Sequence, residues 1–355
     1  MAEGGERVDL LIVGAGPCGL AAAIAAGRAG LRAVVLDRGC LVSGVAAYPP
    51  YMTFFSTAER IAIGGVPFAV AAEKPSRRDA LAYYRAVTRH FGLDVRQYEE
   101  VAGVEALGAT DRDGTRFLVR SRPRGGAERT WRAHAVVVAT GYFGTPSKLG
   151  VPGEDLPHVS HYFDEGHYAF EQDVVVVGGG NSAGQAAVHL ARYARSVTML
   201  VRGAGLAATM SKYLITEIAS NPVISVRVRT EIVDGGGSGG LETLTVADRV
   251  TGRRATLPAT ALFVLIGAEP HTDWLAGMVA RDTQGYLLTG QLAAAENLDP
   301  AWPVERPPML LETSVPGVFA AGDVRSRSVK RVAAAVGEGA TAVRLIHAYL
   351  AGEEA

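Results

Sequence analysis

Two stretches of the chain share the same order of apolar and small residues. The apolar run from Val8 to Val13 leads into GAGPCGL and then into the small-residue segment LAAAIAAGRAG. Later, DVVVVGGGNSAGQAAVHLARY repeats this order, with an apolar run at 174–177, glycines at 178–180 and a helix pattern from about residue 181. Each stretch predicts a buried strand, a tight turn and a helix. The repeat therefore indicates two units of similar construction.

The segments after the first stretch predict the other elements of the first unit. The periodicity of SRRDALAYYRAVTRHF predicts a helix at 76–91 with Ser76 as its N-cap. Pro49-Pro50 argues against a regular helix in the preceding loop, where four aromatic residues either cradle a planar ring or pack as an ordinary loop. Short strands predict a small antiparallel insertion, and AVVVATGYFGTP at 135–146 predicts an apolar strand after it. The insertion strands are expected at 95–98, 101–107, 116–121 and 129–133, and the aromatic residues are Tyr48, Tyr51, Phe54 and Phe55.

The remaining segments complete the second unit and then return to the first. We expect a helix at 211–220, a flexible turn in GGGSGG at 235–240, and a closing apolar strand in ALFVLIGAEP at 261–270. TSVPGVFAAGDV at 313–324 predicts a short strand, and a long helix follows it. Further strands of the second unit are expected near 223–228, 241–247 and 253–257, and the apolar stripe of the last helix comprises Val332, Val336, Val343, Ile346 and Leu350.

This order of elements predicts an α/β fold of two Rossmann-like, three-layer dinucleotide-binding domains, one inserted in the other. The chain passes through the first unit, then through the whole second unit, and returns to the first by a strand and a helix. We expect the discontinuous domain to comprise 1–146 and 268–355, and the inserted domain to comprise 147–267. Two dinucleotide domains imply two cofactors, and the economical chemistry is hydride transfer from a nicotinamide to a flavin.

Gly14, Gly16 and Gly19 form a G-x-G-x-x-G fingerprint between the predicted strand and helix. Gly14 allows the tight turn, Gly16 lets the backbone approach a pyrophosphate, and Gly19 lets the helix pack closely on the strand. The helix start offers unpaired N–H groups and a positive dipole end to phosphates. The next strand, AVVLD, ends in Asp37, where a carboxylate is expected to meet ribose hydroxyls.

Gly178, Gly180 and Ala183 form a second fingerprint of the same kind. The strand that follows it, SVTMLVR, ends in Arg202 and has no acidic residue to bind a free 2′-hydroxyl. Arg202, with Lys212 downstream, is placed to meet a 2′-phosphate, which favours NADP over NAD. The alternative is that Arg202 is only a solvated surface charge.

Composition and charge exclude several classes of function. The net charge is −1 and the sequence pI is about 6.7, so no field of one sign favours nucleic acid or a membrane surface. The N-terminus lacks a basic region followed by a long apolar core, so no signal peptide is evident. Two cysteines, Cys18 and Cys40, cannot form a disulfide framework, and a cytoplasmic location fits best.

Three histidines in a proline-containing loop are the remaining candidates for site chemistry. Their spacing, without cysteine, does not favour a metal site, and the inferred chemistry needs no metal. We therefore expect no metal, although one of these histidines as a proton donor near a flavin is the more plausible role. They are His158, His161 and His167.

Four segments resemble the flavoprotein pyridine-nucleotide reductases of the thioredoxin-reductase class. GAGPCGL, ATGYFGTP, GGGNSA and TSVPGVFAAGDV stand in the order and at the spacing of that class, and the resemblance covers essentially the whole chain. It implies that the first fingerprint binds FAD, that the second binds NADPH, and that the late Gly-Asp pair holds the ribityl–phosphate. It places FAD contacts on Gly14, Gly16, Pro17, Gly19, Asp37, Arg38, Thr140, Gly141, Gly322, Asp323, Arg331 and Val332, and NADPH contacts on Gly178, Gly180, Asn181, Ser182, Ala183, Arg202 and Lys212.

One departure from that class changes the expected activity. Thioredoxin reductases carry a redox C-x-x-C just before the NADPH fingerprint, whereas VPGEDLPHVSHYFDEGHYAF has no cysteine. CLVSGVAAYPPYMTFFSTAERIAIGGVPF, KPSRRDALAYYRAV and VSHYFDEGH are instead similar to the YpdA-type, bacillithiol-disulfide-reductase-like family. That family keeps a cysteine in the first glycine loop, at the place of Cys18. The resemblance implies NADPH-dependent reduction of a low-molecular-weight disulfide, with Cys18 as the candidate catalytic thiol.

The physical case for Cys18 is mixed, and three functions stay open. A helix N-terminus lowers the pKa of a thiol, but a nearby FAD pyrophosphate opposes a thiolate, and a small buried packing residue is the alternative. Cys40 is the poorer candidate, and loop packing is its expected role. The functions are a disulfide reductase, a flavin oxidase, monooxygenase or single-electron reductase, and a redox-sensing flavoprotein without turnover. A homodimer or higher homo-oligomer is the default assembly.

Overall fold

The computed structural model describes residues 5–107, 114–163, 165–295, 302 and 306–352. The chain forms two compact units. The first comprises Met1–Thr145 and Glu269–Ala355, and the second comprises Pro146–Ala268. Each unit contains a parallel β-sheet with helices, so the expected α/β class is confirmed.

Within the described residues, the sheet of the first unit has seven strands, and β1 lies near its centre. Its strand order is β3-β2-β1-β6-β5-β4, and β15 also pairs with β6. The pairs β1–β2, β2–β3, β1–β6 and β6–β15 are parallel, whereas β4, β5 and β6 pair antiparallel. The strands are β1 (Glu6–Val13), β2 (Ala33–Asp37), β3 (Val95–Gln97), β4 (Glu99–Ala106), β5 (Phe117–Pro123), β6 (Arg129–Val138) and β15 (Val318–Ala320).

Two expectations about these strands are wrong. The segment at 95–98 is not part of an antiparallel insertion, because β3 pairs parallel with β2 in the main sheet. The strands expected at 129–133 and from 135 onward are one strand, β6. The first half of β6 pairs with β5 and its last three residues pair with β15, so one continuous strand joins the antiparallel and parallel parts.

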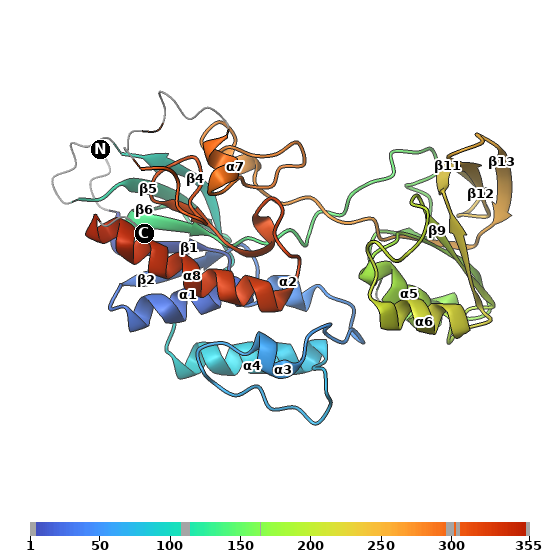
Figure 1. The fold of residues 1–355 in the computed structure, drawn as a ribbon, viewed down its shortest axis with the longest axis horizontal. Coiled ribbons are helices and arrows are strands. Elements are labelled where there is room, and N and C mark those ends of the chain that lie inside the picture. Colours follow the sequence, from blue (N-terminus) through green and yellow to red (C-terminus); the bar gives the residue numbers. More distant parts are fainter. Residues whose placement is uncertain (1–4, 108–113, 164, 296–301, 303–305, 353–355) are drawn as a thin grey trace. The chain divides into compact units, whose positions relative to one another are not determined.

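Two long helices, α1 (Pro17–Arg28) and α8 (Val332–Ala351), pack side by side on the sheet of the first unit (Figure 1). A Cβ on Gly339 of α8 would collide with the backbone oxygen of Cys18 in α1, so only glycine allows this approach. The buried face of α8 combines three small residues, Ala335, Gly339 and Ala342, with the larger Val343, Ile346 and Tyr349. The expected stripe is partly wrong, because Leu350 is exposed and Val332 and Val336 are only half-buried.

The helix expected at 76–91 is present as α4 (Arg77–His90). Ser76 is its N-cap and forms a capping box with Asp79, which satisfies backbone donors of the first turn. Tyr83, Tyr84 and Val87 of α4 pack against Leu20 and Ile24 of α1. Short helices complete the described part of this unit: α2 (Ser43–Ala46), α3 (Ala58–Ile61), α7 (Gln291–Ala294), and the 3₁₀ turns η2 (Asp273–Leu275) and η3 (Gly322–Val324).

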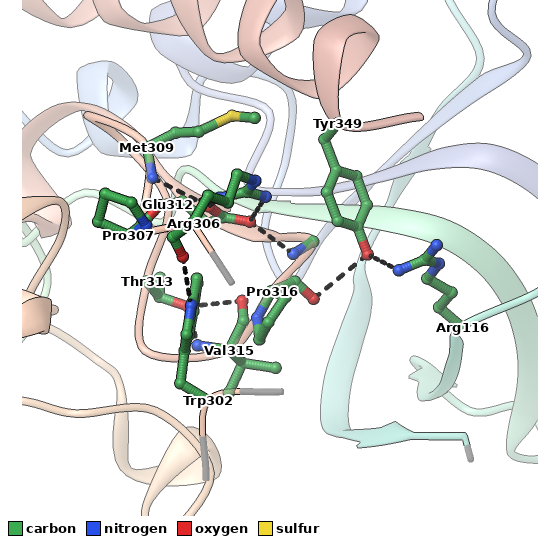
Figure 2. Close-up of polar contacts among 11 residues, drawn as sticks. Arg116, Trp302, Arg306, Pro307, Met309, Glu312, Thr313, Val315, Pro316 and Tyr349 are labelled. Atoms are coloured by element: carbon green, nitrogen blue, oxygen red, sulfur yellow. Dashed lines mark hydrogen bonds and ion pairs between the residues drawn. The ribbon is translucent and has the colours of Figure 1, made fainter. Parts of the chain in front are cut away.

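A buried carboxylate organises the segment before β15 (Figure 2). Glu312 is fully buried, and both of its oxygens accept hydrogen bonds from the Arg306 guanidinium, at 2.6 and 3.0 Å. Glu312 also accepts from the backbone N–H groups of Met309 and Gly317, both at 3.0 Å. Tyr349 lies beside this segment, and a side chain on Gly317 would collide with it. The segment and the C-terminal end of α8 are thus held together.

The described part of the second unit contains a five-stranded parallel sheet and a three-stranded antiparallel sheet. The parallel order is β10-β9-β8-β14-β7, and the antiparallel order is β11-β12-β13. Strand β11 was not expected, and it includes the first two glycines of GGGSGG, so that segment is only partly a turn. The elements are β7 (Val159–Ser160), η1 (Gly166–Ala169), β8 (Asp173–Val177), α5 (Asn181–Leu190), β9 (Ser196–Val201), α6 (Lys212–Ser220), β10 (Ile224–Val228), β11 (Thr230–Gly236), β12 (Thr243–Asp248), β13 (Arg254–Pro258) and β14 (Ala261–Val264).

Within the part of the chain that the structure describes, no helix combines the length and the apolar character needed to cross a membrane.

Candidate functional site

The glycine loop of the first unit lies close against the turn that follows β6. Gly14 has φ +109°, and a Cβ there would come within 2.5 Å of the Ala139 oxygen at the end of β6. A side chain on Gly19 would collide with the Gly14 carbonyl, so α1 starts directly against the end of β1. Gly16 has nothing within 4 Å of its Cβ position. The loop therefore has the geometry that brings backbone close to a phosphate.

Asp37, at the end of β2, is bound by the chain's own loops. One carboxylate oxygen accepts from the Ala15 N–H at 2.7 Å, inside the glycine loop. The other accepts from the Gly39 N–H at 2.7 Å and from the Ser43 hydroxyl at 3.2 Å. A carboxylate offers about four acceptor positions, so room remains for a ribose hydroxyl. Asp37 positions the glycine loop whether or not it also contacts a ligand.

One pocket in the first unit brings most of the predicted FAD residues together. Its wall combines the glycine loop, the end of β2, the turn after β6, the η3 turn and the start of α8. Three predicted FAD residues are not in the wall. Gly19 is buried in α1, and Gly322 packs against Cys18. Arg331 stands at the N-cap position of α8, and its guanidinium lies 4.8 Å from the Phe55 ring centre. The predicted residues in the wall are Gly14, Gly16, Pro17, Cys18, Asp37, Arg38, Thr140, Gly141, Asp323 and Val332.

Two polar side chains in this wall have a buried atom that needs a partner. Neither Oγ1 of Thr140 nor Oδ1 of Asp323 has a hydrogen-bond partner within the described residues. Burial raises the pKa of the Asp323 carboxyl to about 6, and the charge of Lys330 opposes this rise. An unpaired buried polar atom costs about 1–3 kcal/mol. These two atoms therefore fit a ligand rich in hydroxyl groups, such as the ribityl chain of FAD.

The pocket also contains residues that motif analysis did not find. Glu100 of β4, His271 and Trp274 line it, with His271 Nε2 3.7 Å from a Glu100 oxygen. Such residues lie in no motif, so only the fold could place them. Of the four aromatic residues in the early loop, Tyr48 lines the pocket, whereas Tyr51 is exposed.

Cys18 is buried at the N-terminal end of α1. Its burial raises the pKa of the thiol, and the negative charges of Glu338 and Asp323 raise it further. The helix N-terminus was expected to favour a thiolate, but desolvation and these carboxylates outweigh it. Cys18 and Cys40 are both free, and Cys40 is partly exposed. The thiol of Cys18 is therefore protonated in this conformation.

The second fingerprint stands at the corresponding place in the second unit. Gly178 has φ +146°, and a side chain there would collide with the Leu265 carbonyl. Gly180 is the N-cap of α5, which begins at Asn181. The Asn181 side-chain oxygen accepts from the Ser211 N–H at 2.7 Å, so it holds the loop before α6. Ala183 is buried, and the neighbouring Ser182 is exposed.

Arg202 and Lys212 follow β9 and begin α6, respectively. Both side chains are exposed, and neither forms an ion pair with any residue that the structure describes. Both cations are thus available to an anionic group near the second fingerprint.

The three histidines of the second unit are not gathered at one point. His161 Nε2 lies 2.8 Å from a Glu154 oxygen, and Glu154 also accepts from the backbone N–H groups of Leu149 and Gly150. His167 stacks on Phe170 instead. Among the described residues, no group of His, Cys, Asp and Glu side chains could hold a metal ion.

Comparison with known proteins gives concordant matches. The sequence profile described as pyridine nucleotide-disulphide oxidoreductase matches residues 11–292. A "Bacilliredoxin reductase Bdr" of Bacillus subtilis is 39% identical to this chain over 207 aligned residues. The alignment covers 58% of this chain and 61% of the relative, which is less than two thirds of that protein. A "Thioredoxin reductase" of Streptomyces clavuligerus is 30% identical over 351 residues, 97% of this chain and 94% of the relative. The structure of "Bacillithiol Disulfide Reductase Bdr (YpdA)" from Bacillus cereus is 31% identical with a TM-score of 0.81, and covers 96% of this chain and 99% of its own.

Proposed function

The chain belongs to the pyridine nucleotide-disulphide oxidoreductase family, and on that premise we propose that it is an NADPH-dependent flavoprotein that reduces a low-molecular-weight disulfide. Bacillithiol disulfide is the substrate that the name of the Bacillus cereus relative suggests. The first unit is the proposed FAD domain, and the second is the proposed NADPH domain.

The observation that carries the FAD assignment is the pair of unpartnered atoms in the pocket. Thr140 Oγ1 and Asp323 Oδ1 come from the turn after β6 and from η3, yet both belong to the wall of the same pocket. Asp323 would accept from ribityl hydroxyls, and Gly14 and Gly16 would leave room for the pyrophosphate at the start of α1. Bound FAD would supply a two-electron relay, taking a hydride from NADPH and passing the electron pair to the acceptor.

The second unit is proposed to hold NADPH through its own glycine loop. Gly178 and Gly180 would let the backbone approach the pyrophosphate, and the start of α5 would face it. Arg202 and Lys212, both exposed cations, would bind the 2′-phosphate with charge-assisted hydrogen bonds. These cations support NADPH over NADH.

A disulfide acceptor requires either a thiol of this chain or direct reduction. The chain has only two cysteines and no C-x-x-C, so an internal dithiol relay of the thioredoxin-reductase kind is absent. In the proposed exchange, the Cys18 thiolate attacks one sulfur of the disulfide, a mixed disulfide forms on Cys18, and one thiolate leaves. Two electrons and a proton then release the second thiol and restore the Cys18 thiolate.

The burial of Cys18 favours a second candidate function. A protonated thiol with a raised pKa is a poor nucleophile, so electrons from NADPH would pass to oxygen or to a carrier protein instead. The chain would then be a flavin oxidase, a monooxygenase or a single-electron reductase. A flavoprotein that senses the redox state without turnover is the third candidate.

Anaerobic reduction of the purified flavoprotein by NADPH separates these functions. Under the disulfide-reductase proposal, NADPH bleaches the visible flavin absorbance within seconds, and bacillithiol disulfide restores it faster than oxygen does. Cys18→Ser would remove reoxidation by disulfide and leave reduction by NADPH unchanged. Faster reoxidation by oxygen than by any disulfide would favour the second candidate, and a flavin that NADPH does not reduce would favour the third.

The proposal also covers the assembly and the location of the protein. We propose a homodimer or higher homo-oligomer, which sedimentation of the purified protein would test. We propose the cytoplasm as the location, since two free thiols persist in a reducing compartment.

A further inference from the structure

Lys330 lies on the loop that joins the η3 turn to α8, and its ammonium group is enclosed by this loop. The ammonium nitrogen donates to the Asp323 backbone oxygen at 2.6 Å and to the Arg325 backbone oxygen at 3.0 Å. It also donates to the Ser328 hydroxyl at 2.8 Å. An ammonium group has three donors, so these three acceptors satisfy it completely. The Lys330 side chain thus joins the two ends of the loop 323–330 by a hydrogen bond.

Two aromatic rings cover the same ammonium group. It lies 3.9 Å from the centre of the Tyr286 ring and 5.5 Å from the centre of the Tyr142 ring. Both distances are within the range of a cation–π contact. Tyr142 also lines the pocket of the first unit, so a single aromatic ring connects this cation with the pocket wall.

The charge of Lys330 is held without a direct carboxylate partner. No ion pair joins Lys330 to a described residue, and burial lowers the pKa of its ammonium to about 8. The negative charges of Asp323, Asp282 and Glu338 oppose this lowering of the pKa, and Asp323 opposes it most. Since Asp323 lies in the pocket wall, the charge of Lys330 acts on the pocket as well as on its own loop.

The loop that Lys330 closes carries two parts of the pocket wall. Asp323, with its unpartnered Oδ1, lies at the start of the loop, and Val332 opens α8 just after its end. We propose that Lys330 is a positioning residue for FAD. It fixes the Asp323 backbone, and thereby the direction of the Asp323 carboxylate, and it fixes the first turn of α8 against the pocket. This inference rests on the proposed FAD site and extends it to a residue outside the pocket wall.

The test compares FAD affinity with the stability of the FAD-free protein. Lys330→Met removes the charge and all three donors, Lys330→Arg keeps the charge, and the exposed Lys148→Met in the second unit is the matched control. The dissociation constant for FAD is measured by ultrafiltration of the purified full chain, and the melting temperature is measured without FAD. We expect Lys330→Met to weaken FAD binding by about tenfold or more, Lys330→Arg to recover part of the loss, and Lys148→Met to match the wild type.

The outcomes separate this inference from the proposed function. A wild-type chain that does not bind FAD contradicts the proposed function itself. If the wild type binds FAD and Lys330→Met binds it within about twofold of the wild type, Lys330 has no positioning role. A loss of affinity matched by an equal destabilisation of the FAD-free protein also overturns the inference, because it shows a structural role only. If Lys330→Met is insoluble, Ser328→Ala and Tyr286→Leu, which each remove one contact of the ammonium group, decide by the same measurements.

Discussion

The sulfur atom of Cys18 packs against the backbone of Gly322. A Cβ built on Gly322 would come within 3.2 Å of that sulfur, and Gly322 has φ +78°, a conformation that favours glycine. The contact joins the start of α1 to the η3 turn that carries Asp323. The thiol of the phosphate loop is therefore part of a packed junction rather than an open nucleophile.

The second candidate function, in which Cys18 takes no part in the reaction, predicts that the thiol of Cys18 is unreactive in the folded protein. Cys40 is partly exposed and Cys18 is buried with a raised pKa, so a thiol reagent should modify one cysteine in the native state and two in denaturant. A colorimetric disulfide reagent releases one chromophore for each modified thiol, so the absorbance gives the number of reactive cysteines. Cys40→Ser, as the control, should leave no fast-reacting thiol.

The sign of the pH effect follows from the direction of this shift. The folded state raises the pKa of the Cys18 thiol above the unfolded value of 9.0, so folding favours the protonated form. The stability that this provides is complete below about pH 9 and is lost progressively as pH rises from there through the higher pKa of the folded state. Alkylation of Cys18 should therefore stay slow up to pH 9. Rapid native alkylation at pH 8 would contradict the protonated thiol and strengthen the exchange route.

Asp323→Asn should change stability and cofactor affinity in opposite directions. Burial of an ionised carboxylate destabilises the FAD-free protein at neutral pH, so the amide should raise its melting temperature at pH 7. The same change replaces a strong acceptor for ribityl hydroxyls by a weaker one, and FAD affinity should fall by about tenfold. Calorimetry without FAD and FAD titration measure the two effects.

The pH profile gives the control for Asp323. The pKa of its carboxyl is about 6 in the folded state against 3.8 unfolded, so its favourable contribution to stability is complete below pH 3.8 and is lost as pH rises through about 6. The difference in stability between the wild type and Asp323→Asn should therefore grow between pH 4 and pH 6 and then level off. A difference that is constant with pH would show that Asp323 does not titrate in this range.

Glu312→Gln should strongly destabilise the first unit. The substitution removes the charge that pairs with Arg306 in a fully buried site, where breaking an ion pair costs about 3–5 kcal/mol. Denaturant unfolding measures the loss. Glu105→Gln is the matched control, because Glu105 pairs with Arg120 at the surface at 3.8 Å and should contribute less than about 1 kcal/mol. Equal effects of the two substitutions would contradict the structural role of Glu312.

The local patterns of the sequence predicted the parts of the fold that depend on residues close together in the sequence. The capping box at Ser76 and the glycine loops at Gly14 and Gly178 follow from short-range geometry. The continuity of β6 could not be predicted, because it depends on two partners, β5 and β15, that are far apart in the sequence. The buried face of α8 was predicted correctly at Val343 and Ile346 and wrongly at Val332, Val336 and Leu350, for a related reason. The close contact with α1 also places Gly339 and two alanines in this face, and small residues are not marked by an apolar stripe.

The candidate site shows the same limit. Motifs located Asp323 and Thr140, but their unpartnered atoms are visible only once the surrounding walls are in place. The sequence predicted opposing effects on the pKa of the Cys18 thiol. The pKa is raised by burial and by the charge of Glu338, which is 320 residues away in the sequence. Lys330 belongs to no motif-based prediction, because its partners are backbone oxygens and rings rather than a recognisable spacing.

The preference for NADPH should depend on Arg202. A guanidinium that binds the 2′-phosphate contributes a charge-assisted hydrogen bond of about 1.5–3 kcal/mol, and NADH has no group to receive it. Arg202→Ala should therefore raise the apparent dissociation constant for NADPH by about tenfold or more and leave that for NADH nearly unchanged. Anaerobic stopped-flow measurement of flavin reduction against nucleotide concentration gives both constants. Arg253→Ala, at another exposed arginine of the second unit, is the control. If Arg202→Ala weakens NADPH and NADH equally, Arg202 supports the fold of the loop rather than the 2′-phosphate, and Lys212→Met becomes the decisive variant.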